Sequence, residues 1–397
     1  MAVKKLGVQD VDVANKRVFV RVDFNVPIED GKITDDTRIV ESLRTIRHLL
    51  KNGAKVVLAS HLGRPKGKRN PEFSLAPVAK RLSELLGQNV PLARDCVGID
   101  VVEQVNDLNA GDVLLLENLR FHAEEEANDP QFSKELACFA ALYVNDAFGT
   151  AHRAHASTVG VPELVKPAVA GFLMQKELFY LGNLLTNPKR PFYALLGGGP
   201  KVTEKIGILK NLLEIADGVL IGGAMAYPFL VERGWSVGGA LVEQEIRPSV
   251  RAILNAVRGG PKFVELPQDH VITQSFAGDA EAWVTRGTDI LGPHIGMDIG
   301  PVTTNFYGDV LKRAKTVFWN GPLGVYEFEK FAAGTNTVAK VLGESNATVI
   351  IGGGDVVAAV HKAGVADKMA HISTGGGASL EFIEGKELPG VVALTDK

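Results

Sequence analysis

The chain has 397 residues, with 43 Lys and Arg against 46 Asp and Glu, so its formal net charge is −3 at pH 7. This length favours two domains, and the small net charge excludes a global attraction to nucleic acid or anionic membranes, so any basic site must be local. The two cysteines, Cys96 and Cys138, leave no disulfide framework and no cysteine-ligated zinc site available, and their apolar surroundings predict free core thiols of a reducing compartment.

The N-terminal residues Met1–Lys5 run into acidic and apolar residues, without the apolar core of a signal peptide. The longest uncharged stretch, Gly218–Val231, is too short for a membrane span and contains Pro228. We therefore expect a cytoplasmic protein with no membrane partner.

Apolar, β-branched runs alternate with helical patterns in the first part of the chain. Near-continuous apolar strands between helices indicate a parallel sheet that is covered on both faces. The predicted strands are Arg17–Arg21, Lys55–Ala59, Asp112–Leu116 and Leu142–Val144, and the predicted helices include Thr37–Lys51 and Leu75–Leu86.

Basic side chains follow these strands at the points where each strand ends. Ligands of open parallel sheets bind beyond the carboxyl ends of the strands. A single arginine there is usually a surface ion-pair partner, but four at successive strand ends predict a site for a small, multiply charged anion. The four are Arg21, Arg64, Arg120 and Arg153, with Arg38 at the start of the first helix.

A break separates this series from a second one. Pro162 and Pro167 interrupt the pattern, Ala168–Leu185 has the composition of one long helix, and Asn187-Pro188 ends it. A helix that joins two domains fits this pattern, and a helix buried within one domain is the alternative.

A second series of apolar runs fills the rest of the chain. Its predicted helices include Lys205–Leu213 and Val356–Ala363. Together the two series hold too many strands for one sheet, so we expect an α/β protein of two domains, each with a doubly wound parallel sheet. The predicted strands are Pro191–Leu196, Gly218–Ile221, Lys262–Leu266, Thr316–Trp319, Thr348–Ile351 and His371–Ser373.

Several of these strands end in glycines that are followed by single charges. Lys201 and Lys205 follow Gly197–Gly199, and Asp355 follows Gly352–Gly354. A nucleotide-phosphate site typically combines three kinds of residue. Glycines let the phosphates approach the backbone, a lysine balances the phosphate charge, and a carboxylate binds hydrated Mg²⁺. An N-cap of the following helix is an equally good interpretation of Asp355.

The sequence from Ser373 to Gly385 predicts another anion site. A strand end, the glycines Gly375–Gly377 and a helix over Ala378–Glu384, capped by Ser373 or Thr374, would direct backbone N–H groups at a phosphate. A tight turn that binds nothing is the alternative. The tail Lys386–Lys397 is too apolar for a disordered end and should pack against the protein.

Other common sites are absent or weak. The chain has no P-loop, no G-x-G-x-x-G fingerprint and no protein-kinase catalytic loop. His152 and His155 favour anion contact or core packing over a metal site. Glu124–Glu126 is expected to be a solvated face, and the basic stretch Arg64–Arg69 is too short and too poor in aromatic residues to indicate nucleic-acid binding.

Nine segments in this order resemble the phosphoglycerate kinase family along essentially the whole chain. They are Arg21–Pro27, Ser60–Pro65, Leu116–Phe121, Asn145–Gly149, Ala151–His155, Asp298–Pro301, Trp319–Glu327, Gly352–Asp355 and Gly375–Glu381. The resemblance implies a monomeric, cytoplasmic enzyme of glycolysis that transfers phosphate reversibly between ATP and 3-phosphoglycerate, giving ADP and 1,3-bisphosphoglycerate, with Mg²⁺ as cofactor and no nucleic-acid partner.

The resemblance also implies the domains: residues 1–166 with 386–397 for the glycerate, 167–187 for a hinge helix and 188–385 for the nucleotide, with the tail returning to the first domain. The implied glycerate-binding residues are Asp23, Phe24, Asn25, Arg38, His61, Leu62, Gly63, Arg64, Arg120 and Arg153. The implied nucleotide-binding residues are Lys205, Gly296, Asn320, Pro322, Glu327, Gly353, Gly354, Asp355 and Val356.

A carboxylate acceptor is already ionised near neutral pH, because its pKa is about 4, so the reaction needs no general base. What remains is to align two anions and to neutralise the transferred group. We assign that role to Arg38, Lys201, Mg²⁺ on Asp355, and backbone N–H groups at Gly354 and Gly376.

Four positions depart from the family pattern. An extra residue near Pro200 affects the placing of Lys201, Val356 replaces a hydroxyl residue, Val302 replaces a charged one, and Ala224 replaces a glycine. One alternative is therefore a nucleotide-binding protein that kept the fold and lost turnover. Another is an NAD-linked oxidoreductase, which lacks its dinucleotide fingerprint here.

Overall fold

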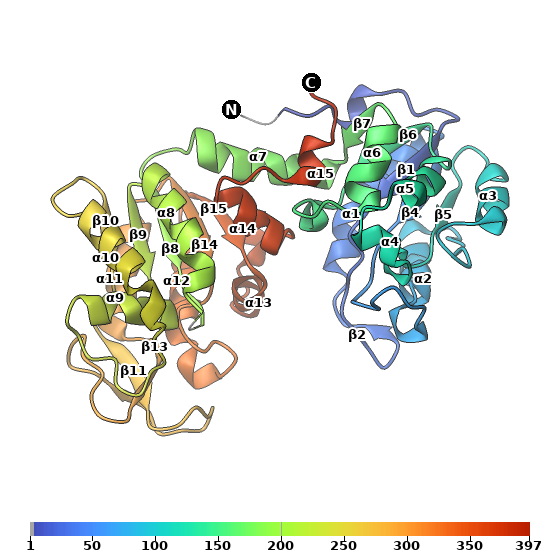
Figure 1. Ribbon diagram of the computed structural model, residues 1–397. Helices are drawn as coiled ribbons and strands as arrows, with labels where there is room; N and C mark the ends of the chain where they lie inside the picture. Colours follow the sequence, from blue (N-terminus) through green and yellow to red (C-terminus); the bar gives the residue numbers. More distant parts are fainter. Residues whose placement is uncertain (1–3, 200) are drawn as a thin grey trace. The chain divides into compact units, whose positions relative to one another are not determined.

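The structure is a computed structural model that describes residues 4–199 and 201–397 (Figure 1). The chain divides into two compact units: the first ends at Phe179 and also contains the segment Glu387–Lys397, and the second is Tyr180–Lys386. Within the described ranges, no helix is long and apolar enough to cross a membrane.

The first unit is built on a five-stranded sheet in the order β5-β4-β1-β6-β7, and every neighbouring pair is parallel. The predicted strands are present, which confirms the α/β class for this unit. Their bounds are β1 Arg17–Arg21, β4 Lys55–Ala59, β5 Val113–Leu115, β6 Leu142–Asn145 and β7 Ala168–Ala170, with a separate antiparallel hairpin of β2 Ile28–Glu29 and β3 Lys32–Ile33.

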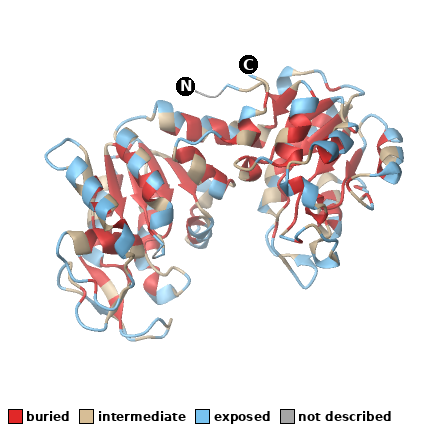
Figure 2. Ribbon diagram, viewed as in Figure 1, coloured by how far each residue is buried: buried red, intermediate tan, exposed pale blue. Residues whose placement is uncertain are grey.

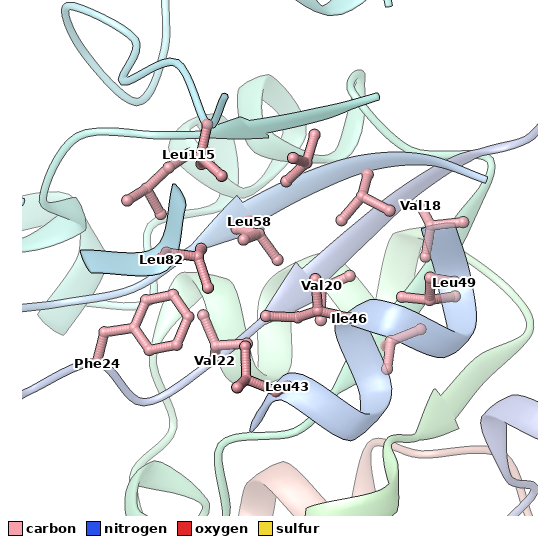
Figure 3. Packing of buried hydrophobic residues seen from close by; sticks show 14 of the residues in the cluster. Val18, Val20, Val22, Phe24, Leu43, Ile46, Leu49, Leu58, Leu82 and Leu115 are labelled. Carbon is pink, nitrogen blue, oxygen red and sulfur yellow. The ribbon is translucent and has the colours of Figure 1, made fainter. Parts of the chain in front are cut away.

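Helix α1 (Thr37–Lys51) packs on this sheet through the face that carries Leu43, Ile46 and Leu49 (Figure 3). These side chains meet Val18 and Val20, alternate residues of β1 that point to the same face. Fully burying one such side chain contributes roughly 1.5–3 kcal/mol, so this face alone anchors the helix.

The remaining helices of the first unit surround the sheet, and their outer faces are exposed (Figure 2). The C-terminal tail belongs to this unit, as predicted: Gly390 N–H donates to the Ala151 carbonyl at 2.8 Å, and Leu6 N–H donates to the Thr395 carbonyl at 2.9 Å. These helices are α2 Ala76–Leu86, α3 Ile99–Asn106, α4 Ala123–Glu126, α5 Pro130–Ala137, α6 Val161–Leu164 and α15 Pro389–Val392.

The predicted helix over Ala168–Leu185 is wrong at its start. Residues 168–170 form the edge strand β7, and the helix α7 spans Phe172–Thr186. One oxygen of the buried Asp146 carboxylate accepts the N–H groups of Leu173 and Met174, which fixes the start of α7. Gly171 is required between the two elements, because a Cβ there would lie 2.2 Å from Asp146.

The second unit contains a six-stranded parallel sheet in the order β10-β9-β8-β14-β15-β16. The predicted strands are again present. A three-stranded antiparallel sheet, β12-β11-β13, was not predicted. The bounds are β8 Phe192–Leu196, β9 Gly218–Ile221, β10 Phe263–Glu265, β11 His270–Thr273, β12 Trp283–Val284, β13 Ile295–Ile299, β14 Thr316–Asn320, β15 Thr348–Gly352 and β16 His371–Ile372.

Helices cover the larger sheet, and their apolar side chains form a core with the strands; Trp319 of β14 is completely buried there. Three predicted helix starts shift: α8 begins one residue later than expected, α13 begins two residues earlier, and α14 is preceded by Gly376 rather than capped by Ser373 or Thr374. The bounds are α8 Ile206–Ile215, α9 Tyr227–Glu232, α10 Arg247–Ala256, α11 Pro301–Leu311, α12 Ala333–Glu344, α13 Gly354–Lys362 and α14 Gly377–Ile383.

Both parallel sheets are doubly wound. In the first unit the strand order reverses between β1 and β6, and in the second it reverses between β8 and β14. Ligands of such sheets bind outside the carboxyl ends of the strands at this switch point. The two switch points are therefore where sites are expected.

Candidate functional site

The carboxyl ends of β1 and β6 carry a cluster of cationic side chains. Arg21, the last residue of β1, is only 1% exposed. Its Nε donates to the Ser157 hydroxyl at 2.7 Å, and a second guanidinium nitrogen donates to the Val22 carbonyl. Because the guanidinium is held by these bonds, it is a fixed positive charge beneath the site.

Two residues after β1, Asp23 pairs with Arg38 of α1. The Asp23 side chain is nearly buried, whereas one third of the Arg38 side chain is exposed, at 33%. Asp23 also accepts the Asn25 N–H at 3.3 Å, and the Asn25 amide oxygen accepts the Gly63 N–H at 2.9 Å. Asp23 therefore orients Arg38 and the loop after β1.

The buried His61 has a defined tautomer. Its Nδ1 lies 3.3 Å from a guanidinium nitrogen of Arg21, and a guanidinium can only donate, so Nδ1 accepts and Nε2 carries the proton. Burial, followed by the charges of Arg21 and Arg120, lowers the pKa of His61 well below its ordinary value. The ring is thus neutral at pH 7 and offers a single N–H donor.

His155 is a second buried, neutral imidazole in the cluster. Burial lowers its pKa to about 3, and the charges of Arg21, Arg120 and Arg153 act in the same direction. Arg21 and Arg120, together with Arg38, also act on His61. The structure therefore brings four of the five predicted arginines, namely Arg21, Arg38, Arg120 and Arg153, around two neutral imidazoles.

Arg120 is held by the loop that follows β4. It is 4% exposed, donates to the Gly63 carbonyl at 2.8 Å and pairs with Glu126 at 3.1 Å. Gly63 has φ +61°, and a Cβ there would lie 2.4 Å from the Phe73 ring. Only glycine fits this turn without strain.

Three predicted residues are placed differently. Arg64 is exposed and forms no hydrogen bond or ion pair with another described residue. The Phe24 and Leu62 side chains lie in the hydrophobic core, and their backbone N–H groups donate to Ser60 and Asn118. These two residues shape the loops and do not present side chains to a ligand.

Sequence reasoning missed Glu125, because the run Glu124–Glu126 was expected to be a solvated face. Glu125 is completely buried, and its carboxylate accepts the Ser157 hydroxyl at 2.5 Å and the Ser157 N–H at 2.9 Å. The same hydroxyl accepts from Arg21. Glu125 thus carries the negative charge that compensates Arg21 through Ser157, and no local sequence signal marked it.

In the second unit, a cavity of about 300 Å³ lies beside the β8/β14 switch point. Glycines, the apolar side chains of Met297 and Leu323, and the carboxylates Asp298, Glu327 and Asp355 line it. An apolar wall with a few polar groups at one end suits a nucleotide. Of the predicted nucleotide residues, Gly296, Pro322, Glu327 and Asp355 line this cavity, and Ala224 does too.

Lys205 lies next to the glycine-rich ends of β8 and β14. Its Nζ donates to the Gly197 carbonyl at 2.6 Å, and a Cβ at Gly198 or Gly321 would come within 2.9 Å of that nitrogen. Burial lowers the pKa of Lys205, and the charge of Asp355 opposes the shift. Lys205 and Asp355 are therefore close enough for their opposite charges to interact.

Asp355 is not the N-cap of α13. Gly353, with φ +97°, holds that position, and Asp355 lies exposed in the first turn without a capping hydrogen bond. Its carboxylate is free to bind a cation, since no described residue pairs with it. Oxygen donors of this kind fit Mg²⁺, which usually takes one or two carboxylates together with substrate phosphates.

Asn320 and Val356 support this loop from inside. The buried Asn320 side chain donates to the Gly352 carbonyl at 2.7 Å, and a Cβ at Gly353 would lie 2.6 Å from the same amide nitrogen. Val356 is completely buried in the core of the second unit. An apolar side chain that packs in the core therefore stands where the family pattern has a hydroxyl residue.

Lys201 and Gly376 lie outside the cavity lining. The Lys201 side chain is 79% exposed and lies 4.0 Å from Glu204, and Pro200 falls outside the described residues. Gly376 precedes α14 with φ +52°. Val302 is 55% exposed and does not line the cavity.

The cavity wall also contains His270, Tyr227 and Asp298, none of which sequence reasoning assigned to the site. Burial lowers the pKa of His270 to about 4 and raises that of Asp298 to about 7. The Tyr227 hydroxyl donates to the Gly296 carbonyl at 3.0 Å. They come from an antiparallel sheet and a helix that no strand-end rule identifies.

Comparison with known proteins gives concordant matches. The family model described as phosphoglycerate kinase matches residues 8–386. The phosphoglycerate kinase of Koribacter versatilis is 54% identical over 99% of this chain and 100% of that protein, and that of Clostridium tetani is 53% identical over 100% and 99%. A solved structure of phosphoglycerate kinase from Coxiella burnetii has a TM-score of 0.90 at 40% identity and covers 98% of both chains.

Proposed function

Because this chain belongs to the phosphoglycerate kinase family, we propose that the cationic cluster of the first unit binds the glycerate substrate and the cavity of the second unit binds the nucleotide. The resemblance seen in the sequence is confirmed. The protein is a phosphotransferase of glycolysis, and it transfers a phosphoryl group reversibly between ATP and the carboxylate of 3-phosphoglycerate. The NAD-linked alternative has no support in these matches.

The cationic cluster is the single observation that carries the assignment of the glycerate site. Fixed guanidinium groups and neutral imidazole N–H donors bind phosphate and carboxylate oxygens well. The lowered pKa values of His61 and His155 make both rings poor bases. A carboxylate acceptor has pKa ~4 and needs no base, which suits this site.

Nucleotide binding is assigned to the loops around Lys205 and Asp355. The glycines let phosphates approach the backbone, the N-terminus of α13 offers N–H groups, and Lys205 supplies charge. Asp355 would hold the Mg²⁺ that accompanies the nucleotide. When bound, Mg²⁺ neutralises phosphate charge.

For the transfer itself, we assign Arg38 and Lys201 to the charge on the moving phosphoryl group, with backbone N–H groups at Gly354 and Gly376. Both side chains are exposed enough to reorient when substrates bind, at 33% and 79%. We further propose that residues 1–166 with 386–397 and residues 188–385 act as the two binding domains, with 167–187 as hinge. The proposed working form is a cytoplasmic monomer.

Separate calorimetric titrations with 3-phosphoglycerate and Mg-ATP test the assignment. Arg153→Ala should weaken 3-phosphoglycerate binding at least about tenfold, the value of one charged hydrogen bond, and leave Mg-ATP binding unchanged. Lys205→Met should do the reverse. If either variant weakens both ligands equally, or neither, the assignment is wrong.

A further inference from the structure

Three potential metal ligands meet in the first unit, outside the residues assigned above. Asp95 and Cys96 lie in the loop before α3, and His122 precedes α4. His122 Nε2 is 2.7 Å from Asp95 Oδ1, and Cys96 directly follows Asp95 in the chain. One donor atom from each of the three residues lies within 4.8 Å of the others.

The surrounding structure holds these donors in place. The Cys96 side chain is completely buried, while the Asp95 and His122 side chains are 39% and 27% exposed. The His122 ring stacks on Phe132, with centroids 5.2 Å apart, and Asp95 also accepts the Cys96 N–H at 2.7 Å. The thiol is therefore held inside the protein, and the two partly exposed ligands leave an entry path for a metal ion from solvent.

We propose that Asp95, Cys96 and His122 form a binding site for a borderline-soft divalent cation of the Zn²⁺ class. Sulfur, imidazole and carboxylate are the donors that Zn²⁺ takes, and three protein ligands leave a fourth position for water. Mg²⁺ prefers oxygen alone, so the site selects against the metal of the nucleotide.

Binding of a tetrahedral Zn²⁺ requires only a small rearrangement of the three ligands. Ligand atoms around a tetrahedral Zn²⁺ are about 3.3–3.8 Å apart, so Nε2 and Oδ1 must separate slightly and the thiol must approach. Burial raises the pKa of the Cys96 thiol, so the metal displaces a proton from sulfur when it binds. The sequence excluded a cysteine-ligated zinc site because the cysteines are few and far apart, and only the fold places His122 beside Cys96.

Titration of chelator-treated, full-length protein with Co²⁺, a spectroscopic substitute for Zn²⁺, tests the site. We expect a thiolate-to-cobalt charge-transfer band that saturates at one metal per chain, is removed by Zn²⁺ and persists in excess Mg²⁺. Absence of the band at millimolar Co²⁺ would overturn the proposal without any variant.

Two substitutions and one matched control locate the ligands. Cys96→Ser should abolish the band, and His122→Asn, which keeps both thiols, should weaken Co²⁺ binding at least about tenfold. The control is Cys138→Ser, because Cys138 is the other cysteine of the chain and is exposed, contrary to the expectation of a core thiol. A band that survives Cys96→Ser or disappears in Cys138→Ser would contradict the site.

Discussion

Glu125→Gln tests the idea that a buried carboxylate organises the glycerate site from below. Glu125 accepts two hydrogen bonds from Ser157, and Ser157 in turn accepts from Arg21. The amide keeps the size of the side chain, but its NH₂ group must face one of the two donors. It also removes the charge that compensates Arg21.

The expected cost follows from these bonds. A hydrogen bond to a charged group contributes about 1.5–3 kcal/mol, and an unsatisfied buried donor costs about 1–3 kcal/mol. These two costs fall on the same pair of donors and overlap, so we expect the first unit to lose about 2–4 kcal/mol of stability. Because Arg21 fixes the His61 tautomer, the KM for 3-phosphoglycerate should rise, whereas the KM for Mg-ATP should not change.

Amide hydrogen exchange resolves the effect by unit. Peptides that contain β1 and β6 should lose protection by about 30-fold or more, the equivalent of about 2 kcal/mol, and those containing β8 and β14 should not. Glu124→Gln is the matched control, since it makes the same chemical change at an exposed neighbour. Equal behaviour of the two variants would refute the reasoning.

Three further predictions concern other parts of the chain. Arg38→Ala should lower kcat by roughly 10³-fold with little change in the Kd of Mg-ATP. The control is Arg81→Ala, which removes a surface ion-pair arginine of the same unit and should retain kcat. Equal losses of turnover and ATP affinity in Arg38→Ala would reject the role of Arg38. Lys201→Ala should likewise reduce kcat more than Mg-ATP affinity in steady-state assays, and an unchanged kcat would remove Lys201 from the transfer step. Burial raises the pKa of Asp146 to about 7, so the folded state keeps a proton that the unfolded chain releases above pH ~4. The free energy of unfolding of the wild type should therefore fall by up to about 1.4 kcal/mol per pH unit between pH 5 and pH 7, relative to that of Asp146→Asn. Parallel pH profiles of the two proteins in urea unfolding would contradict this.

Elements whose own residues carry the pattern were predictable. Helix α1 and the strands β1, β4 and β9 have the predicted bounds, because continuous apolar runs and helical periodicity are local properties. The sequence did not reveal that residues 168–170 form a strand. Their pairing with β6 and the cap from Asp146 are long-range contacts that override local helical composition.

Some residues of the candidate site were predictable from the sequence, and others were not. Strand-end arginines could be found from topology alone, since parallel strands end at one edge of the sheet. The buried Glu125 between two exposed glutamates, and His270 on the cavity wall, could not be found, because burial there depends on how separate segments pack. The sequence left an N-cap and a metal ligand as equally good interpretations of Asp355, because the glycines before it obscure where α13 begins.

The central claim is that this protein phosphorylates a carboxylate. Purified protein with Mg-ATP, 3-phosphoglycerate and hydroxylamine tests it directly, because an acyl phosphate is trapped as a hydroxamate. We expect hydroxamate to form only with both substrates, at an ordinary enzyme rate of about 1–10³ s⁻¹. Calorimetric binding of both substrates without any hydroxamate would contradict the account and would identify a binding protein that has lost turnover.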